Sequence, residues 1–162
     1  MAKKTSYWLI KSEPDVYSIA DLERDGRSPW DGIRNYQARN FMMQEMAPGD
    51  GVLYYHSSAD PPGIAGIARV ASEAYPDPTQ FDRQSRYYDA KSTREKPRWW
   101  LVDVEFVESF PVELPLPFLR EQAALDGMAL LRKGQRLSIQ PVTAAEWKTV
   151  RSLAARAAKR SL

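Results

Sequence analysis

Residues 6–11 constrain the fold more than any other short stretch of the chain. Their apolar side chains occupy both alternating faces of an extended segment, with Tyr7 and Leu9 on one face and Trp8 and Ile10 on the other. This pattern is typical of a strand that is covered on both sides. The sequence therefore predicts a central strand here.

Length and composition limit the size of the fold and the kinds of site that the chain can form. A chain of 162 residues has the size of one domain, so we expect a single domain over residues 1–162. The absence of cysteine excludes a disulfide framework, a thiolate metal site and a nucleophilic cysteine. The apolar run at 7–10 is far too short for a signal-peptide core or a membrane span. We expect a soluble, cytoplasmic protein with no membrane partner and no cofactor.

Turn residues divide the rest of the chain into short elements. Ser18, with an acidic residue three positions later, is expected to cap a short helix that Gly26 ends. Residues 26–33 are expected to form a loop, and apolar residues at helical spacing predict a helix over 35–46. Gly66 marks a bulge or a close backbone approach inside a strand. The other expected elements are strands at 51–56, 63–70, 99–107 and 135–140, short helical segments at 118–125 and 128–133, and a C-terminal helix opened by a capping box at 143–146.

Residues 74–98 are polar, aromatic and rich in turn formers, with no sustained strand or helix period. A loop of that length in a compact domain is uncommon and usually functional. The net charge is only +2, but basic residues gather between 83 and 98. The charged residues of segment 103–113 are all acidic. A second basic run fills the last sixteen residues, and we interpret it as a solvated face.

Several blocks of the sequence together resemble the EVE domain. In the order found in that family, they are residues 8–14, 30–41, 49–50, 54–57, 63–66 and 87–92. The resemblance implies an α+β, PUA-like fold, in which a small, bent and mostly antiparallel β-barrel carries flanking helices. This fold is related to the YTH domains that bind methylated adenine in RNA. The resemblance also implies a pocket at the barrel mouth for a flipped-out base, with modified cytosine in DNA as the ligand usually proposed.

One position departs from the family pattern. Ala90 stands where the family commonly has proline in a Tyr-Tyr-Asp-Pro-Lys-Ser stretch. The loop is looser without proline, which weakens the transfer of site residues from the family at 87–92.

Reading a base outside its stack requires an aromatic face and polar groups that test the edge of the base. We expect Trp30 to supply the face and Asn35 to supply the polar group. The alternative for Trp30 is a core residue that closes the end of the barrel. The alternative for Asn35 is a helix N-cap, and the two roles are compatible because a cap uses one atom of the amide.

Further side chains are candidates for the same pocket. Ser12 follows the first strand and either reaches the barrel mouth or belongs to a turn. Tyr54 and His56 share one face of their strand, so both line the pocket or both belong to the core, and Ser57 begins the loop beyond them. His56 is the only histidine. Without a second imidazole or a thiolate, it is expected to be structural or pocket-lining, and neither a catalyst nor a metal ligand.

The loop at 83–98 mixes basic and aromatic residues, as in sites that hold phosphates by charge and stack a base on a ring. Its ligand-binding candidates are Tyr87, Tyr88, Lys91 and Ser92. The phosphate-binding candidates are Lys11, Arg34, Arg39, Arg83, Arg86 and Arg94. The alternative is a solvated loop fixed by its two tyrosines.

These features predict a non-enzymatic module that binds a modified base in DNA or RNA. A competing hypothesis is an enzyme that acts on a nucleic-acid base or backbone. One histidine, no cysteine, no glycine-rich phosphate loop and no evident carboxylate pair speak against it, and we expect no catalytic residue. A third hypothesis is an interaction module that docks a protein through its basic tail.

Overall fold

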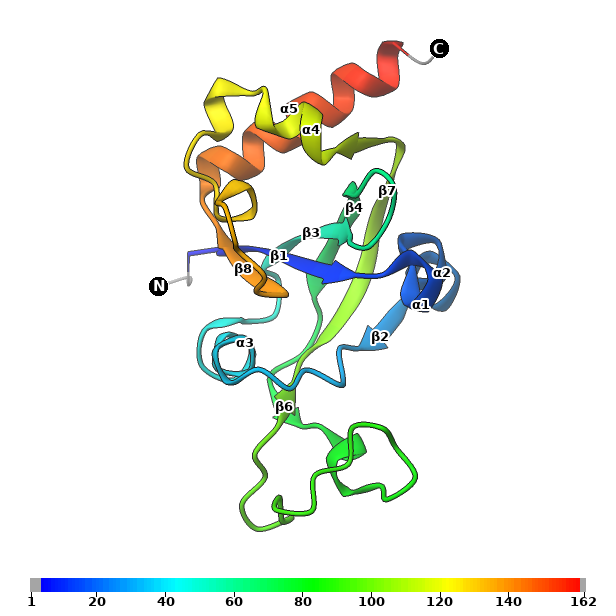
Figure 1. The fold of residues 1–162 in the computed structure, drawn as a ribbon, viewed down its shortest axis with the longest axis vertical. Coiled ribbons are helices and arrows are strands. Elements are labelled where there is room, and N and C mark those ends of the chain that lie inside the picture. Colours follow the sequence, from blue (N-terminus) through cyan, green and yellow to red (C-terminus); the bar gives the residue numbers. More distant parts are fainter. Residues whose placement is uncertain (1–3, 161–162) are drawn as a thin grey trace.

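The computed structural model describes residues 4–160 and is built around a curled six-stranded sheet (Figure 1). The strand order is β2-β7-β4-β3-β1-β8, and every neighbouring pair is antiparallel except β1 with β3. The strands are β1 (Tyr7–Ser12), β2 (Arg27–Pro29), β3 (Gly51–His56), β4 (Gly63–Val70), β7 (Asp103–Pro115) and β8 (Ile139–Val142). The sheet forms half of a barrel, which confirms the expected α+β class.

The strand β1 lies between β3 and β8, with apolar cover on both faces, as its sequence predicts. Trp8 and Ile10 belong to one buried cluster, whereas Leu9 belongs to a second cluster. Successive side chains of a strand point to opposite faces, so the two clusters cover the two sides of the sheet.

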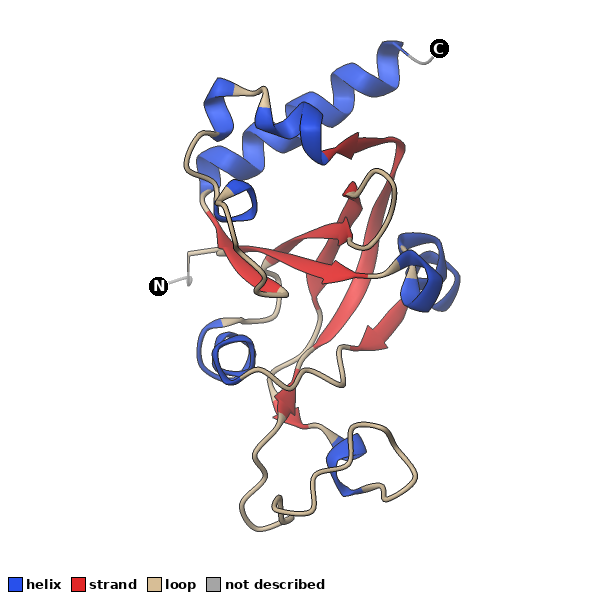
Figure 2. Cartoon of the chain, viewed as in Figure 1, coloured by secondary structure: helices blue, strands red, loops and turns tan. Residues whose placement is uncertain are grey.

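Helices complete both clusters. The second cluster includes Trp147 and Val150 of α5 (Ala144–Arg160) and Leu119 of α4 (Leu116–Arg120), and both helices lie above the sheet in Figure 2. The first includes Leu22 of α2 (Ile19–Asp25) and Met42. None of the helices within residues 4–160 is both long and apolar enough to cross a membrane.

Helix ends follow the expected capping residues. Ser18 and Asp21 form a reciprocal capping box at α2, after the short helix α1 (Pro14–Tyr17), and Gly26 ends α2 with a φ of 77°. The capping box of Thr143 and Glu146 opens α5. These local predictions are confirmed.

Two predicted elements differ in detail. The helix expected over 35–46 begins as α3 (Tyr36–Asn40) and continues as the π-helical segment η1 (Phe41–Glu45), in which Met46 N donates to Phe41 O at 2.8 Å. The expected loop at 26–33 contains β2, because three of its residues pair with the distant strand β7. That pairing leaves no local signal in the sequence.

The hairpin of β3 and β4 contains the predicted irregularity at Gly66. The pairing of β4 with β7 shifts between Ile64 and Gly66, and a Cβ atom at Gly66 would collide with the carbonyl oxygen of Glu108 in β7. Both the bulge and the close backbone approach are therefore present.

The two late strands need correction. The strand expected at 99–107 is two strands, β6 (Trp100–Leu101) and β7, and β7 continues to Pro115 because its second half pairs with the start of β4. The last strand is Ile139–Val142 and not 135–140, since Leu137 N donates to Gln135 Oε1 in a turn before it. Between them lie the 3-10 helices η3 (Ala123–Leu125) and η4 (Ala129–Leu131).

Residues 75–98 form a lobe that hangs below the sheet in Figure 1. It begins with β5 (Tyr75–Pro76), which pairs with β6, and η2 (Pro78–Phe81). Fully buried Gln80 organises the lobe by donating to Asp77 O and Trp99 O and by accepting from Trp99 N and Ser92 Oγ. The long loop is thus an ordered structure without regular periodicity.

Candidate nucleic-acid interface

A cavity of about 360 Å³ opens where the end of β1 meets α1, β2 and the lobe. This volume falls within the range of small-molecule sites. Its lining contains three aromatic rings, two acidic or basic side chains and two hydroxyl groups besides the tyrosines. The lining residues are Lys11, Ser12, Val16, Tyr17, Ser28, Pro29, Trp30, Asp31, Gly32, Ile33 and Tyr87.

A larger cavity of about 590 Å³ lies between α4 and η4. Its lining combines Arg120 and Arg132 with Glu121 and Asp126, and contains no aromatic side chain. A base gains little there, because it finds no ring to stack on and no excess of positive charge for its phosphate. Of these two cavities, the smaller one is the better candidate, because three aromatic residues line it.

Trp30 both packs against the core and lines the cavity. Its backbone N–H donates to Val102 O at 3.0 Å, and its half-buried ring packs against the first core cluster. The ring lies nearly perpendicular to Tyr17 and Tyr54, with centroid distances of 6.3 and 5.7 Å. Trp30 is one of the residues that line the cavity. The neighbouring rings therefore hold the indole in place beside the cavity.

Tyr54 and His56 are buried and are not among the residues that line the cavity, so the structure does not support their expected contact with a ligand there. Tyr54 is fully buried and donates through its hydroxyl to Tyr17 O at 2.6 Å, and burial raises its pKa. His56 accepts a hydrogen bond at Nε2 from Ile19 N at 3.1 Å, and its Nδ1 lies 3.2 Å from the carboxylate of Glu113. Of the two alternatives for this strand face, pocket lining or core, the structure shows the core.

The end of β1 supplies a polar edge to the cavity. Ser12 Oγ donates to Tyr17 O at 2.7 Å, so the serine both fixes the turn and lines the cavity. Lys11, expected to contact phosphate, lines the cavity itself, and burial lowers the pKa of its amine. Ser57 lies outside the lining and donates through its backbone N–H to Ser12 O at 3.0 Å.

Asp31 is a lining residue that sequence reasoning missed. Burial and the nearby charge of Asp77 raise the pKa of its carboxyl group, whereas Arg34 acts in the opposite direction. Within residues 4–160, no other side chain donates a hydrogen bond to this carboxylate. Asp31 is therefore an acceptor that remains available to a ligand.

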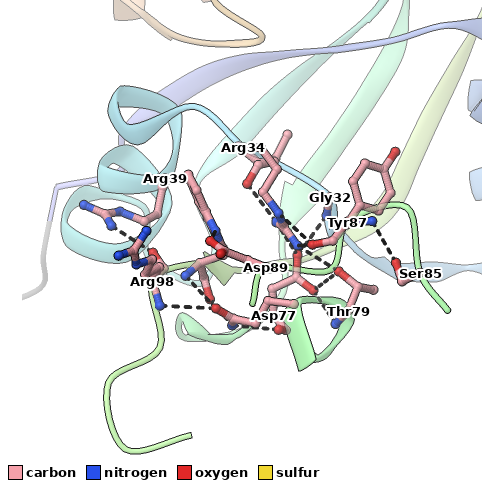
Figure 3. Close-up of polar contacts among 12 residues, drawn as sticks. Gly32, Arg34, Arg39, Asp77, Thr79, Ser85, Tyr87, Asp89 and Arg98 are labelled. Atoms are coloured by element: carbon pink, nitrogen blue, oxygen red, sulfur yellow. Dashed lines mark hydrogen bonds and ion pairs between the residues drawn. The ribbon is translucent and has the colours of Figure 1, made fainter. Parts of the chain in front are cut away.

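Asp77 fastens the lobe to the cavity wall (Figure 3). It is only 1% exposed and accepts from Gly32 N at 2.8 Å, Thr79 N at 2.8 Å and Arg34 Nη1 at 3.1 Å. Burial alone would raise the pKa of Asp77, but the hydrogen bonds from Thr79, Gly32 and Arg34 lower it below the ordinary value. Arg34 also donates to Tyr87 O at 2.7 Å. The donors of its guanidinium are thus used within the protein, and its expected role at phosphate stays a prediction.

The lobe reaches the cavity through Tyr87. Gly32 has a φ of 80°, and a Cβ atom there would lie 2.6 Å from Tyr87 Cζ. Only glycine allows this backbone conformation together with so close an approach of the ring. Arg34 and Arg86 lie 5.5 and 5.1 Å from the centroid of that ring. Tyr87 lines the cavity, and its expected role in binding a ligand stays a prediction.

The other candidates lie away from the cavity. Asn35 caps α3, with Oδ1 accepting from Ala38 N at 2.9 Å, and its expected contact with a base in this cavity is not supported. Ser92 is buried on Gln80, so it holds the lobe together. Tyr88 and Lys91 are exposed outside the lining.

The basic candidates fall into two groups. Arg39 donates to Arg98 O at 2.8 Å and to Asn40, so part of its guanidinium is committed within the protein. Arg83, Arg86 and Arg94 have exposed side chains on the lobe. Their role at phosphate stays a prediction.

The model of the EVE domain family matches residues 6–153. Human Thymocyte nuclear protein 1 (THYN1) is 40% identical over 168 residues, which cover 92% of this chain and 74% of that protein. The structure of human THYN1 in complex with 5-methylcytosine containing DNA has a TM-score of 0.85 and 42% identity, covering 93% of this chain and 98% of that chain. A structure from Pseudomonas syringae has a TM-score of 0.87 and 51% identity, covering 91% and 99%.

A more distant likeness concerns the fold alone. The YTH domain of Zygosaccharomyces rouxii MRB1, solved with N6-methyladenosine RNA, has a TM-score of 0.55 and 13% identity, covering 95% of this chain and 89% of that chain. The PUA-like fold expected from the sequence is confirmed by these structures. Because the family model spans most of the chain and the human relative is 40% identical, this chain belongs to the EVE domain family.

Proposed function

We propose that this chain is a non-enzymatic module that binds DNA carrying a modified cytosine, which is turned out of its stack into the cavity at Trp30. The observation that carries the proposal is the combination of Trp30, Tyr17 and Tyr87 with the acceptor Asp31 in one cavity of about 360 Å³. The complex of human THYN1 with 5-methylcytosine containing DNA supports it. The cytoplasmic location expected from the sequence stays a prediction.

The indole of Trp30 supplies the stacking surface in this proposal. Its contacts with Tyr17 and Tyr54 fix the ring before the ligand arrives, so little side-chain entropy is lost on binding. Stacking of a base on an aromatic ring contributes ~1–3 kcal/mol. This gain offsets part of the cost of removing the base from its own stack.

Asp31 reads the polar edge of the base. A carboxylate accepts a hydrogen bond from the exocyclic amino group of cytosine, whereas thymine presents a carbonyl oxygen at the same position. The 5-methyl group by itself contributes only ~0.8 kcal/mol, or about fourfold in affinity. The amino group therefore accounts for more of the selectivity than the methyl group does.

The test compares three single-stranded oligonucleotides that differ only in the central base: 5-methylcytosine, cytosine or thymine. We expect about fourfold preference for 5-methylcytosine over cytosine. The preference over thymine should be about 10- to 100-fold, because a hydrogen bond to a charged acceptor contributes about 1.5–3 kcal/mol. The oligonucleotides should be recovered unchanged.

Asp31→Asn should reduce the preference for 5-methylcytosine over thymine, since the amide can donate to the thymine carbonyl. Asp126→Asn, in the larger cavity, is the matched control and should leave the preference intact. Equal affinity of the unaltered protein for 5-methylcytosine and cytosine would refute modified-base recognition, and equal affinity for 5-methylcytosine and thymine would refute the role of Asp31. Product formation would favour the enzyme hypothesis.

A further inference from the structure

Tyr36 exposes a large aromatic ring beside the lobe. It is the first residue of α3 and is 53% exposed, although its ring stacks on buried Trp99 with a centroid distance of 4.9 Å and an interplanar angle of 20°. Trp99 is itself fixed, because its Nε1 donates to Asp89 at 2.8 Å and its backbone N–H donates to Gln80 at 3.0 Å. One face of Tyr36 is thus held by a rigid partner.

A large part of the Tyr36 side chain stays exposed, since the residue is 53% exposed although one face of its ring stacks on Trp99. The guanidinium of Arg39 lies 4.7 Å from the centroid of Tyr36 and 6.0 Å from the centroid of Trp99. If the guanidinium lay on the outer face of Tyr36, the guanidinium and the two rings would form one column. The distance from Arg39 to the centroid of Trp99 would then approach the sum of the 4.7 Å from Arg39 to Tyr36 and the 4.9 Å from Tyr36 to Trp99. The shorter distance places Arg39 beside the stack, so it does not cover the outer face.

The Tyr36 ring is connected to the cavity by a row of stacked groups. Arg34 lies 5.5 Å from the centroid of Tyr87, which lines the cavity, and 5.2 Å from the centroid of Trp99, which carries Tyr36. The path from Tyr87 to Tyr36 runs through Arg34 and Trp99, and each of its three distances is 5.5 Å or less. A strand of a few nucleotides can span this path, because each stacked nucleotide advances about 3.4 Å. Arg39 adds positive charge at the Tyr36 end of this row, which suits a phosphate backbone, whereas the charge of Arg34 is paired with Asp77.

We propose that the outer face of Tyr36 is a second stacking platform, which binds an unpaired base a few nucleotides from the base in the cavity. The inference rests on the proposed function, because it concerns the same nucleic-acid strand. Tyr36 stacks this second base, Trp99 supports the other face of Tyr36, and the guanidinium of Arg39 lies 4.7 Å from the centroid of the Tyr36 ring. The module therefore contacts one strand at two aromatic points.

The first test separates the platform from the cavity by the length of the ligand. One ligand is 5-methyl-deoxycytidine monophosphate, which fills the cavity alone, and the other is a single-stranded nonamer with a central 5-methylcytosine. Tyr36→Ala should weaken binding of the nonamer by about 5- to 100-fold, which is the effect of losing one base-on-ring stack. It should leave binding of the mononucleotide unchanged, and Tyr36→Phe should bind both ligands like the unaltered protein.

Val107→Ala is the control, since Val107 is an exposed apolar residue of β7 outside the cavity lining. It should bind both ligands normally. If Tyr36→Ala binds the nonamer normally while Trp30→Ala does not, the platform is wrong and the proposed function stands. If the unaltered protein binds neither ligand, the proposed function and the platform both fall.

A second measurement does not depend on the folding of a variant. A 2-aminopurine base, whose fluorescence falls when it stacks on an aromatic ring, is moved through each position within four nucleotides of the 5-methylcytosine. The unaltered protein should quench it at one or two positions, and Tyr36→Phe should keep that quenching. Absence of quenching at every position, with the oligonucleotide bound, would overturn the platform.

Discussion

Replacement of Asp77 by Asn is expected to detach the lobe of residues 75–98 from the cavity wall with almost no change in side-chain size. Asp77 is 1% exposed and accepts hydrogen bonds from Gly32, Thr79 and Arg34. An asparagine has one acceptor oxygen and turns an amino group toward these donors. The substitution therefore removes the charge that Arg34 neutralises and leaves backbone donors unsatisfied.

Breaking one partner of a buried ion pair costs about 3–5 kcal/mol. The side chain of Arg34 is 22% exposed, so water can solvate part of the released guanidinium, and we expect about 3 kcal/mol. A domain of this size loses about 2–4 °C in Tm for each kcal/mol, so Asp77→Asn should melt about 6–12 °C lower. Affinity for a 5-methylcytosine oligonucleotide should also fall, because Tyr87 is no longer fixed.

The pH dependence gives an independent readout. The pKa of Asp77 in the folded protein is lowered from its ordinary value of 3.8, so its contribution to stability is present above that value and is lost as the pH falls through the folded pKa. The unaltered protein should therefore lose stability below about pH 4, and Asp77→Asn should show less of this loss. This is measured by thermal melts over a pH series.

Asp82→Asn is the control, because Asp82 is an exposed residue of the same lobe that accepts from Gln84 N at 2.9 Å. Its stability should change by less than about 0.5 kcal/mol. If Asp77→Asn melts like the unaltered protein and shows the same acid sensitivity, the account of the lobe attachment is wrong.

Three further predictions concern the core, the cavity wall and the lobe charges. His56→Gln should lower the free energy of unfolding by about 1–3 kcal/mol, because the Ile19 N–H loses a buried acceptor. The folded variant should still bind oligonucleotides normally. Loss of a nucleic-acid cleavage activity in this variant would contradict the structural role of His56. Gly32→Ala should destabilise the protein and displace Tyr87, since its Cβ would lie 2.6 Å from the ring at a φ of 80°; normal melting and binding would show that the wall tolerates a methyl group. Replacement of a phosphate-contacting arginine in the lobe should lower the slope of log affinity against log salt by about 0.7 for single-stranded DNA; unchanged slopes for Arg83, Arg86 and Arg94 would place the phosphates elsewhere.

The sequence predicts those parts of the fold that depend on residues close to one another along the chain. The capping boxes at Ser18 and Thr143 join residues three positions apart, so their motif alone indicates a helix start. Gly66 signals its bulge through its own residue type, although the backbone for which it makes room belongs to the distant Glu108. The short strand β2 left no such signal, since its pairing depends on residues about 76 positions away.

The candidate site was predicted in part for the same reason. Trp30, Ser12 and Tyr87 are brought together, but the sequence does not show that Arg34 is committed to Asp77, which lies 43 positions further along the chain. Alternation correctly puts Tyr54 and His56 on one strand face. Alternation does not show whether that strand face lines the cavity or is buried in the core. Asp31 lies within a family block, and its position beside Trp30 was the signal that could have identified it.

The most direct test of the central claim is the affinity of Trp30→Ala for a single-stranded oligonucleotide with one 5-methylcytosine. The ring is half buried beside Tyr17 and Tyr54, so the variant should lose less stability than the ~3–5 kcal/mol of a fully buried tryptophan, and binding is measured at a temperature where a melt shows it folded. We predict affinity about 10- to 100-fold weaker than that of the unaltered protein, with Trp30→Phe between the two. A folded Trp30→Ala protein that binds the oligonucleotide with unchanged affinity would contradict the claim that this cavity receives the base.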